Sequence, residues 1–138
     1  EQYSVEDIGL RACELYKHTY TETVYLYDDV IETLTALQNK NIRLILVSDA
    51  DSDVLTPQFS KLGLDPYFND RIISSDIKSY KPSDETASFI KSLLKETDTN
   101  LLFVGDSPED IEIAKKIGAE SIFIGKPSPQ ASHTISQF

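Results

Sequence analysis

The sequence predicts an α/β fold, a three-layer, doubly wound parallel sheet with helices on both of its faces. Three observations support this prediction. Short, nearly continuous apolar runs are typical of strands buried on both faces. Longer segments of helical periodicity lie between these runs. Gly63 and Gly118 each follow such a segment, where helices commonly end. Alternating strands and helices favour a parallel sheet with helices on both faces.

The N-terminal part is predicted to be mainly helical. Ser4 followed by Asp7 is typical of a helix start, and apolar residues recur at helical intervals after it. The segment 21–27 is rich in β-branched and aromatic residues, which favours an extended conformation. For this part of the chain we therefore expect a helix over 4–20, an extended segment over 21–27 and a helix from Asp28 or Asp29 to Leu37.

The remainder of the chain shows the clearest alternation. The expected strands cover 42–47, 71–74, 101–104 and 121–124. The expected helices cover 53–62, 83–95 and 108–118. Residues 127–138, with Pro127, Pro129 and several serines, are expected to form a tail over the surface.

Composition excludes several classes of function. The net charge is −10, from 23 acidic and 13 basic residues, and so acidic a surface repels nucleic acid and anionic membranes. No apolar run is long enough for a membrane helix, and no signal peptide is visible, so a cytoplasmic location is expected. With only Cys13, His18 and His133, a zinc site is not expected. We expect Cys13 to be a small buried hydrophobic residue. Nothing in the sequence indicates an oligomeric state.

Polar residues gather where the predicted strands end. Ser48 and Asp49 follow the first strand, Lys81 lies in the loop after the second, and Asp106 and Asp110 follow the third. In sheets of this kind, ligands bind outside the carboxyl ends of the strands. Hydroxyl, ammonium and paired carboxylates at one edge are the components of a site for phosphate and a metal ion.

Asp106, Asp110 and Lys81 each have a chemical rationale, and Asp110 also has a structural alternative. Asp106 can present a carboxylate to a hard cation such as Mg²⁺, which prefers oxygen ligands. Asp110 can support that metal, although Ser107 to Asp110 is also an acceptable helix capping box. Lys81 precedes Pro82, which favours an extended backbone there, and its charge can neutralise a phosphoryl oxygen.

The order of these segments resembles a known family. ILVSD (45–49), KP (81–82) and VGDSPEDIEIAKKIGA (104–119) are similar to the second, third and fourth motifs of the haloacid dehalogenase superfamily. KLGLDPYFNDRIISSD (61–76) resembles the segment that connects the second and third motifs. The resemblance implies a hydrolase core over 25–138, preceded over 1–24 by the trailing helix of a helical cap.

The resemblance also implies a role for each site residue. Ser48 would hold the phosphoryl group, Lys81 would stabilise the nucleophile and the phosphoryl charge, and Asp106 would coordinate Mg²⁺ with support from Asp110. Asp49 stands where many members have Asn. We therefore expect its side chain to point away from the phosphate, or its backbone N–H to bind it. The implied substrate is a small phosphorylated molecule.

The family's first motif is absent. Members attack with an Asp in a D-x-D-x-[TV] sequence at the end of the central strand, and no such sequence occurs here. That strand would lie between the strands that end at Val47 and Val104. The chain also begins with Glu1 and contains no methionine. We therefore expect these residues to belong to a longer protein that supplies the nucleophile, and we expect the 138-residue chain alone to be inactive.

Four functional classes stay open at this point. The paired acids favour a Mg²⁺-dependent phosphatase. A 2-haloacid dehalogenase shares the Ser and Lys motifs and needs no metal. A phosphoacceptor signalling domain is disfavoured, because there the lysine follows all of the acids, whereas Lys81 precedes Asp106. A non-catalytic binding module with the same fold is the fourth class.

Overall fold

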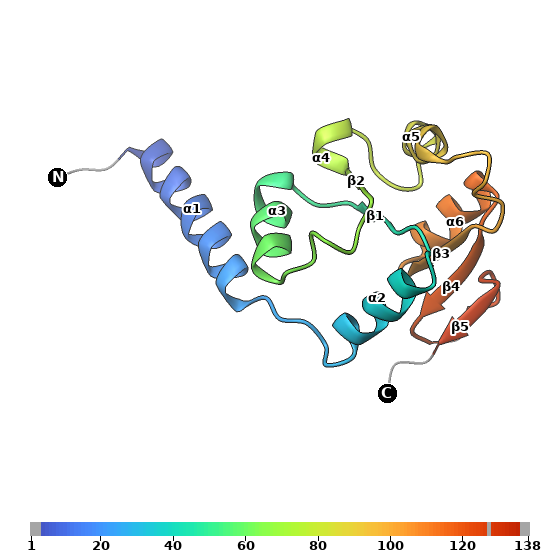
Figure 1. The fold of residues 1–138 in the computed structure, drawn as a ribbon. Helices are drawn as coiled ribbons and strands as arrows, with labels where there is room; N and C mark the ends of the chain where they lie inside the picture. The colour runs from blue at the N-terminus through green and yellow to red at the C-terminus, as the bar shows by residue number, and fades with distance from the viewer. Residues whose placement is uncertain (1–3, 127, 136–138) are drawn as a thin grey trace. The chain divides into compact units, whose positions relative to one another are not determined.

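The computed structural model describes residues 4–126 and 128–135. They belong to two compact units, with the boundary between Ile73 and Ser74. Figure 1 follows the chain through both units by colour. The first unit contains α1 (Val5–Thr23), α2 (Val30–Asn39), β1 (Ile45–Ser48), α3 (Ser52–Lys61) and β2 (Asp70–Ile73). The second contains α4 (Ser74–Ile77), α5 (Asp84–Leu93), β3 (Leu102–Gly105), α6 (Pro108–Ile117), β4 (Glu120–Ile124) and β5 (His133–Ile135).

In the first unit, β1 and β2 are parallel neighbours connected through α3, with Val47 opposite Ile72. This is the strand–helix–strand unit that the sequence predicts. Phe59 of α3 is buried, and its ring lies 5.2 Å from that of Phe68. The buried Phe59 therefore anchors α3, whose N-terminus follows the end of β1.

Helix α1 begins as expected but ends later. Ser4 and Asp7 form a capping box. The helix continues to Thr23, so the extended segment predicted over 21–27 is wrong at its start, and extended backbone begins only at Val24. Hydrogen bonds from α3 hold this end of α1: Gln58 Nε2 donates to the carbonyl of Tyr20, and Lys61 Nζ donates to the carbonyl of Glu22. These tertiary contacts outweigh the local β propensity of the segment.

In the second unit, the strands form a parallel sheet in the order β3-β4-β5, packed with α6. Strand β5 corrects the expectation of a surface tail, because His133 pairs opposite Ile122 of β4. Pro127 and residues 136–138 of that predicted tail lie outside the described residues. Gly118 adopts a φ of +76° and ends α6, as predicted. The buried apolar residues of this unit are Ala87, Ile90, Ile111, Ile113 and Ala114.

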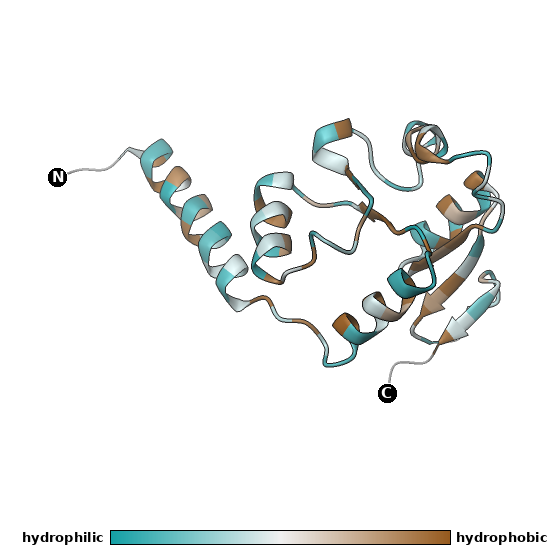
Figure 2. Cartoon of the chain, viewed as in Figure 1, coloured by the Kyte–Doolittle hydropathy of each residue, from teal (hydrophilic) through white to brown (hydrophobic). Residues whose placement is uncertain are grey.

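The predicted single sheet is divided into two sheets, one in each unit. Within the described ranges, β1 pairs only with β2, and β3 pairs only with β4. The apolar runs form the strands, and Figure 2 shows their hydropathy. However, Leu102 and Val104 of β3 are more than half exposed, so the prediction of a fully buried strand is wrong there. Exposure alternates along β3, so the face that carries Leu102 and Val104 is the less covered one among the described residues.

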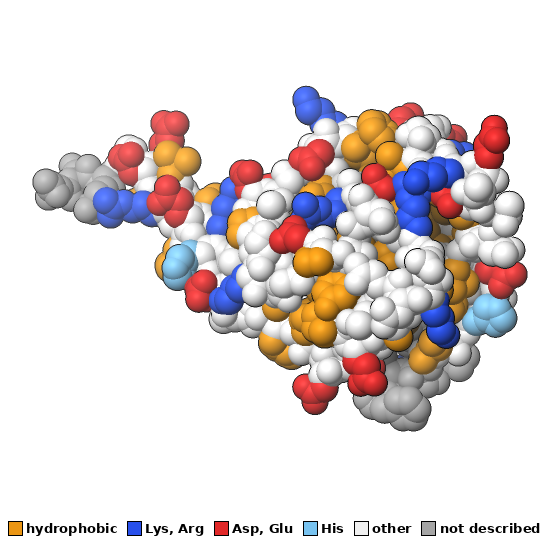
Figure 3. Space-filling model, in the orientation of Figure 1, with side chains coloured by type: hydrophobic (Ala, Val, Ile, Leu, Met, Phe, Trp, Pro, Cys, Tyr) orange, Lys and Arg blue, Asp and Glu red, His pale blue; other side chains and the backbone are white. Residues whose placement is uncertain are grey.

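Surface features bear on two further expectations. On the face seen in Figure 3, acidic and basic side chains are interspersed. Within residues 4–126 and 128–135, no helix has the length and apolar character needed to cross a membrane. Cys13 is exposed, so the expectation that it is buried is wrong. It lies on α1, a helix without any buried residue in the described part of the chain.

Candidate active site

The turn from β3 into α6 brings Asp110 back to the end of the strand. Ser107 is the N-cap of α6, and its hydroxyl accepts a hydrogen bond from the Asp110 N–H at 3.3 Å. In return, Asp110 Oδ2 accepts bonds from the Ser107 N–H at 3.0 Å and the Ser107 hydroxyl at 2.9 Å. Pro108 occupies the first turn, where its missing N–H costs nothing. The capping box expected from the sequence is therefore present, and it orients the Asp110 carboxylate.

Gly105 leaves the space that the Asp110 carboxylate occupies. A Cβ at position 105 would lie 2.2 Å from Asp110 Oδ2, which no side chain could tolerate without displacing that carboxylate. The N–H of Asp106 adds a third bond to Oδ2, at 3.1 Å. Asp106 itself is exposed. One carboxylate is thus fixed at the strand end, and the other is accessible to a ligand.

Lys81 completes this cluster. Its ammonium donates to Asp110 Oδ1 at 2.5 Å, and the two side chains are only 11% and 8% exposed. A charge pair this buried needs good geometry and further hydrogen bonds to be favourable, and the bonds to Oδ2 supply them. The structure therefore brings Lys81, Asp106 and Asp110 together within the second unit.

A ring of hydroxyl groups holds the Lys81 loop. Ser79 Oγ and Ser83 Oγ are 2.6 Å apart, on either side of Lys81 in the sequence. The hydroxyl of Thr86, a fully buried residue of α5, lies 3.0 Å from Ser83 Oγ and 3.1 Å from Ser79 Oγ. The Ser83 N–H also donates to the Tyr80 carbonyl. These contacts fix the loop on α5 and limit the positions that the lysine can reach.

Two opposing effects act on the Asp110 carboxyl. Burial is the largest influence, and it raises the pKa of this group. The hydrogen bond and charge of Lys81, with the bonds from Ser107, favour the ionised form and outweigh burial. The pKa of Asp110 is therefore below its ordinary value, and the group is a carboxylate at neutral pH.

The carboxylates of this site are the type of ligand that Mg²⁺ prefers, but they are too few to complete its coordination by themselves. Asp106 offers an exposed carboxylate, the hard oxygen ligand that Mg²⁺ prefers. Both oxygens of Asp110 have protein partners, because Oδ2 accepts three hydrogen bonds and Oδ1 accepts the ammonium of Lys81. Among the described residues, no group of three His, Cys, Asp or Glu side chains could hold a metal ion. Because Mg²⁺ commonly binds through one or two carboxylates plus waters and substrate phosphate, the residues present fit part of such a site.

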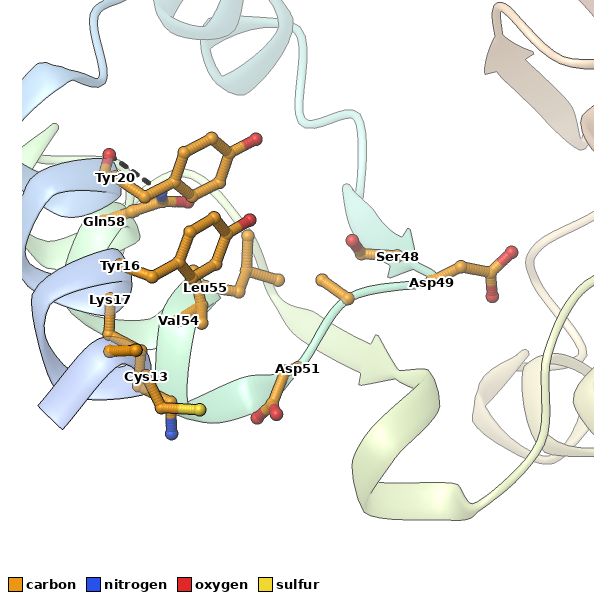
Figure 4. A pocket seen from close by; sticks show the side chains of 12 residues that line it. Cys13, Tyr16, Lys17, Tyr20, Ser48, Asp49, Asp51, Val54, Leu55 and Gln58 are labelled. Carbon is orange, nitrogen blue, oxygen red and sulfur yellow. Dashed lines mark hydrogen bonds between the residues drawn. The ribbon is translucent and has the colours of Figure 1, made fainter. Parts of the chain in front are cut away.

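Ser48 and Asp49 lie in the first unit, at the end of β1. Their side chains point to opposite sides of the chain (Figure 4), as alternation along a strand requires. The Ser48 hydroxyl points toward the side on which α1 lies, and the exposed Asp49 carboxylate points away. Ser48 lines a pocket of about 780 Å³ between this strand end, α1 and α3.

With this geometry established, comparison with known proteins identifies the family. Residues 2–124 match the haloacid dehalogenase-like hydrolase family. The chain belongs to that family, as its motifs indicated.

The relatives and structural neighbours have different names. Phosphoglycolate phosphatase of Salmonella paratyphi A is 33% identical over 107 residues, which cover 78% of this chain and 42% of the relative. The chain therefore spans less than half the length of that curated relative. Bacillus subtilis YfnB, described as a HAD-hydrolase bound to magnesium, superposes with a TM-score of 0.80 at 21% identity, over 96% of this chain and 60% of that one. The structure of a dehalogenase superposes with a TM-score of 0.74 at 21% identity, over 86% of this chain and 56% of that one. At this identity, the two structural matches show only that this chain shares their fold.

Some features of the site were not predicted from the sequence. The space that Gly105 leaves for Asp110 depends on tertiary structure. The hydroxyl ring of Ser79, Ser83 and Thr86 was not predicted, since no motif marks it. Tyr16 and Tyr20 are both more than half exposed and line the pocket beside Ser48, which was not predicted from the sequence. Their spacing of four residues, which places them on one face of a helix, was the available signal.

Proposed function

We propose that this chain is part of a Mg²⁺-dependent phosphatase that hydrolyses a small phosphorylated metabolite. One observation carries the proposal: the buried Lys81–Asp110 ion pair lies at the end of β3, where Asp106 offers an exposed carboxylate. The fold of this chain belongs to a hydrolase family, and the first curated relative has the name of a phosphatase.

Each residue has a distinct task in this proposal. Lys81 stabilises negative charge on the transferring phosphoryl group, and Asp110 holds the lysine in place. Asp106 binds Mg²⁺ with support from Asp110, and the metal, when bound, neutralises phosphoryl charge. Ser48 donates its hydroxyl to a phosphoryl oxygen, with the Asp49 N–H as a second donor. The family's cap-and-core division, with the cap ending near residue 24, stays a prediction, as does a cytoplasmic location.

The nucleophile is proposed to come from residues outside these 138. The chain lacks the D-x-D-x-[TV] sequence, and β1 and β3 each have one strand neighbour among the described residues. A further strand that carries an Asp at its end would satisfy unpaired backbone groups as well as supply the attacking carboxylate. This chain alone is therefore expected to be inactive.

The test compares p-nitrophenyl phosphate hydrolysis by the 138-residue chain and by the natural protein that contains it, with Mg²⁺ and with EDTA. We expect turnover only by the natural protein, and only with Mg²⁺. Equal turnover by the chain alone would contradict an external nucleophile. Turnover in EDTA would contradict the role of the metal.

A 2-haloacid dehalogenase is the second candidate. It shares the Ser and Lys motifs, here Ser48 and Lys81, and its chemistry uses them without a metal. Chloride release from 2-chloropropionate, without any release of phosphate from monoesters, would select this alternative.

A further inference from the structure

The pocket beside Ser48 has an aromatic wall. It occupies about 780 Å³, within the range of ordinary small-molecule sites. Tyr16 and Tyr20 of α1 form one side, with their ring centroids 5.5 Å apart and their planes within 11° of parallel. Figure 4 shows both rings projecting from α1 toward the side on which Ser48 lies. Val54 and Leu55 of α3 add apolar surface to the same pocket.

This wall has a defined position within its unit. Gln58, which is buried, donates to the Tyr20 carbonyl at 3.2 Å, and Lys17 Nζ lies 3.0 Å from Asp53 Oδ2. The contacts connect α1 to α3 near both tyrosines. The stacked rings are therefore held on α1 with much of their surface free, since each is more than half exposed.

Apart from the phosphoryl group, whose charge Lys81 and Mg²⁺ balance in the proposed function, the charges of the pocket disfavour an anionic group. Among the described residues that line it, Lys17 is the cation, and Asp53 already engages its ammonium. Asp51 adds a carboxylate, which accepts the N–H of Asp53 at 3.0 Å. A substrate carboxylate placed here would meet negative charge without an uncommitted lysine or arginine to balance it.

We infer that this pocket binds the organic part of the phosphorylated substrate, and that this part is an uncharged aromatic ring. The inference rests on the proposed function, because it places the phosphoryl group at Ser48. A flat ring packs against the exposed tyrosine surface in offset or edge-on arrangements. A two-carbon acid such as the glycolate of the named relatives would leave most of the pocket unfilled and its carboxylate unpaired. Tyr16 and Tyr20 are thus assigned as specificity-determining residues.

The first experiment uses the natural protein that contains this chain. Hydrolysis of phenyl phosphate and of 2-phosphoglycolate is compared for wild type, Tyr16→Ala and Tyr20→Ala. We expect phenyl phosphate to be preferred in kcat/KM. Each alanine variant should raise the KM for phenyl phosphate about five- to tenfold and leave the KM for 2-phosphoglycolate unchanged. Tyr16→Phe should restore the wild-type KM.

Tyr25→Ala is the matched control, because Tyr25 is a similarly exposed tyrosine that does not line the pocket. Its KM for phenyl phosphate should equal that of wild type. A preference for 2-phosphoglycolate, or an equal effect of Tyr16→Ala on both substrates, would overturn the inference.

A binding measurement separates this inference from the proposed function. Saturation-transfer NMR compares phenylphosphonate with phosphonoacetate, two analogues that cannot be hydrolysed at the P–C bond in this way. Ring protons of phenylphosphonate should receive saturation that weakens in Tyr16→Ala, whether or not any ester is hydrolysed. If no monoester is hydrolysed but this binding persists, the phosphatase proposal fails and the aromatic subsite stands. If phosphonoacetate binds and phenylphosphonate does not, the subsite assignment fails.

Discussion

The ammonium of Lys81 and the carboxylate of Asp110 form an ion pair of 2.5 Å that joins two motifs separated by 29 positions. Lys81 comes from the loop before α5 and Asp110 from the first turn of α6. The pair fixes the lysine beside the end of β3, and the Ser107 cap fixes the carboxylate. The geometry of the candidate site therefore depends on local helix capping as much as on catalytic chemistry.

Asp110→Asn is expected to destabilise the protein by about 3 kcal/mol, as breaking a buried ion pair typically does. The Asn side chain has only one oxygen that accepts hydrogen bonds. Its NH₂ group would therefore face either the Lys81 ammonium or the N–H groups of Asp106 and Ser107, which are all donors. Urea denaturation measures the loss. Asp84→Asn is the control, because the Lys116–Asp84 pair is 32% and 88% exposed and should contribute much less. Similar losses in the two variants would contradict the account.

The stability difference between wild type and Asp110→Asn should depend on pH. The pKa of Asp110 is lowered in the folded state, so its contribution is fully present above the ordinary carboxyl pKa. That contribution is lost as the pH falls from about 4 through the lowered value. Denaturation at a series of pH values from 7 downward should show the two proteins converging in acid. A difference that does not change with pH would argue against an ionised Asp110.

Gly105→Ala is expected to displace the Asp110 carboxylate, because the new Cβ would lie 2.2 Å from Oδ2. We expect a destabilisation of about 1–3 kcal/mol, typical of forced overpacking, together with a loss of phosphatase activity. Thermal unfolding and p-nitrophenyl phosphate hydrolysis, both with the natural protein that contains this chain, measure the two effects. Gly9→Ala in α1 is the control, because nothing lies within 4 Å of its Cβ position. An active, fully stable Gly105→Ala variant would disprove the close contact.

Lys81→Met should reduce kcat about 10²- to 10³-fold in the natural protein, the usual effect of removing one group that stabilises transition-state charge. The KM should change much less, because the loss is expected in the transition state. Steady-state phosphate release measures both constants. Lys91→Met, an exposed lysine of α5, is the control and should have wild-type kinetics. An unchanged kcat in Lys81→Met would show that Lys81 does not stabilise the transition state.

Local pattern was sufficient for much of the fold. The helix start at Ser4, the capping box at Ser107 and the helix-ending Gly118 follow from short-range chemistry, and all three are confirmed. The predicted end of α1 was wrong because the contact between Gln58 and Tyr20 outweighs the β propensity of residues 21–27. Strand β5 was missed because Pro and Ser near it favour a loop, whereas pairing with β4 decides its conformation.

The candidate site shows the same division. Lys81, Asp106 and Asp110 were selected from their places at strand ends, and the structure places them together in the second unit. Their individual roles stay predictions. The exposure of Cys13, the hydroxyl ring at Thr86 and the pocket wall of Tyr16 and Tyr20 depend on how elements pack. Residue spacing along one chain contains little information about such packing.

The most direct test of the central claim is a Mg²⁺ titration of phosphate release by the natural protein, for wild type and Asp106→Asn. The account predicts that wild-type activity requires Mg²⁺ and disappears in EDTA. It predicts that Asp106→Asn needs far more Mg²⁺ for half-maximal activity and loses about 10²-fold or more in rate, as loss of a metal ligand implies. Activity that is independent of Mg²⁺ and unchanged in Asp106→Asn would contradict a metal-assisted phosphatase site at the end of β3.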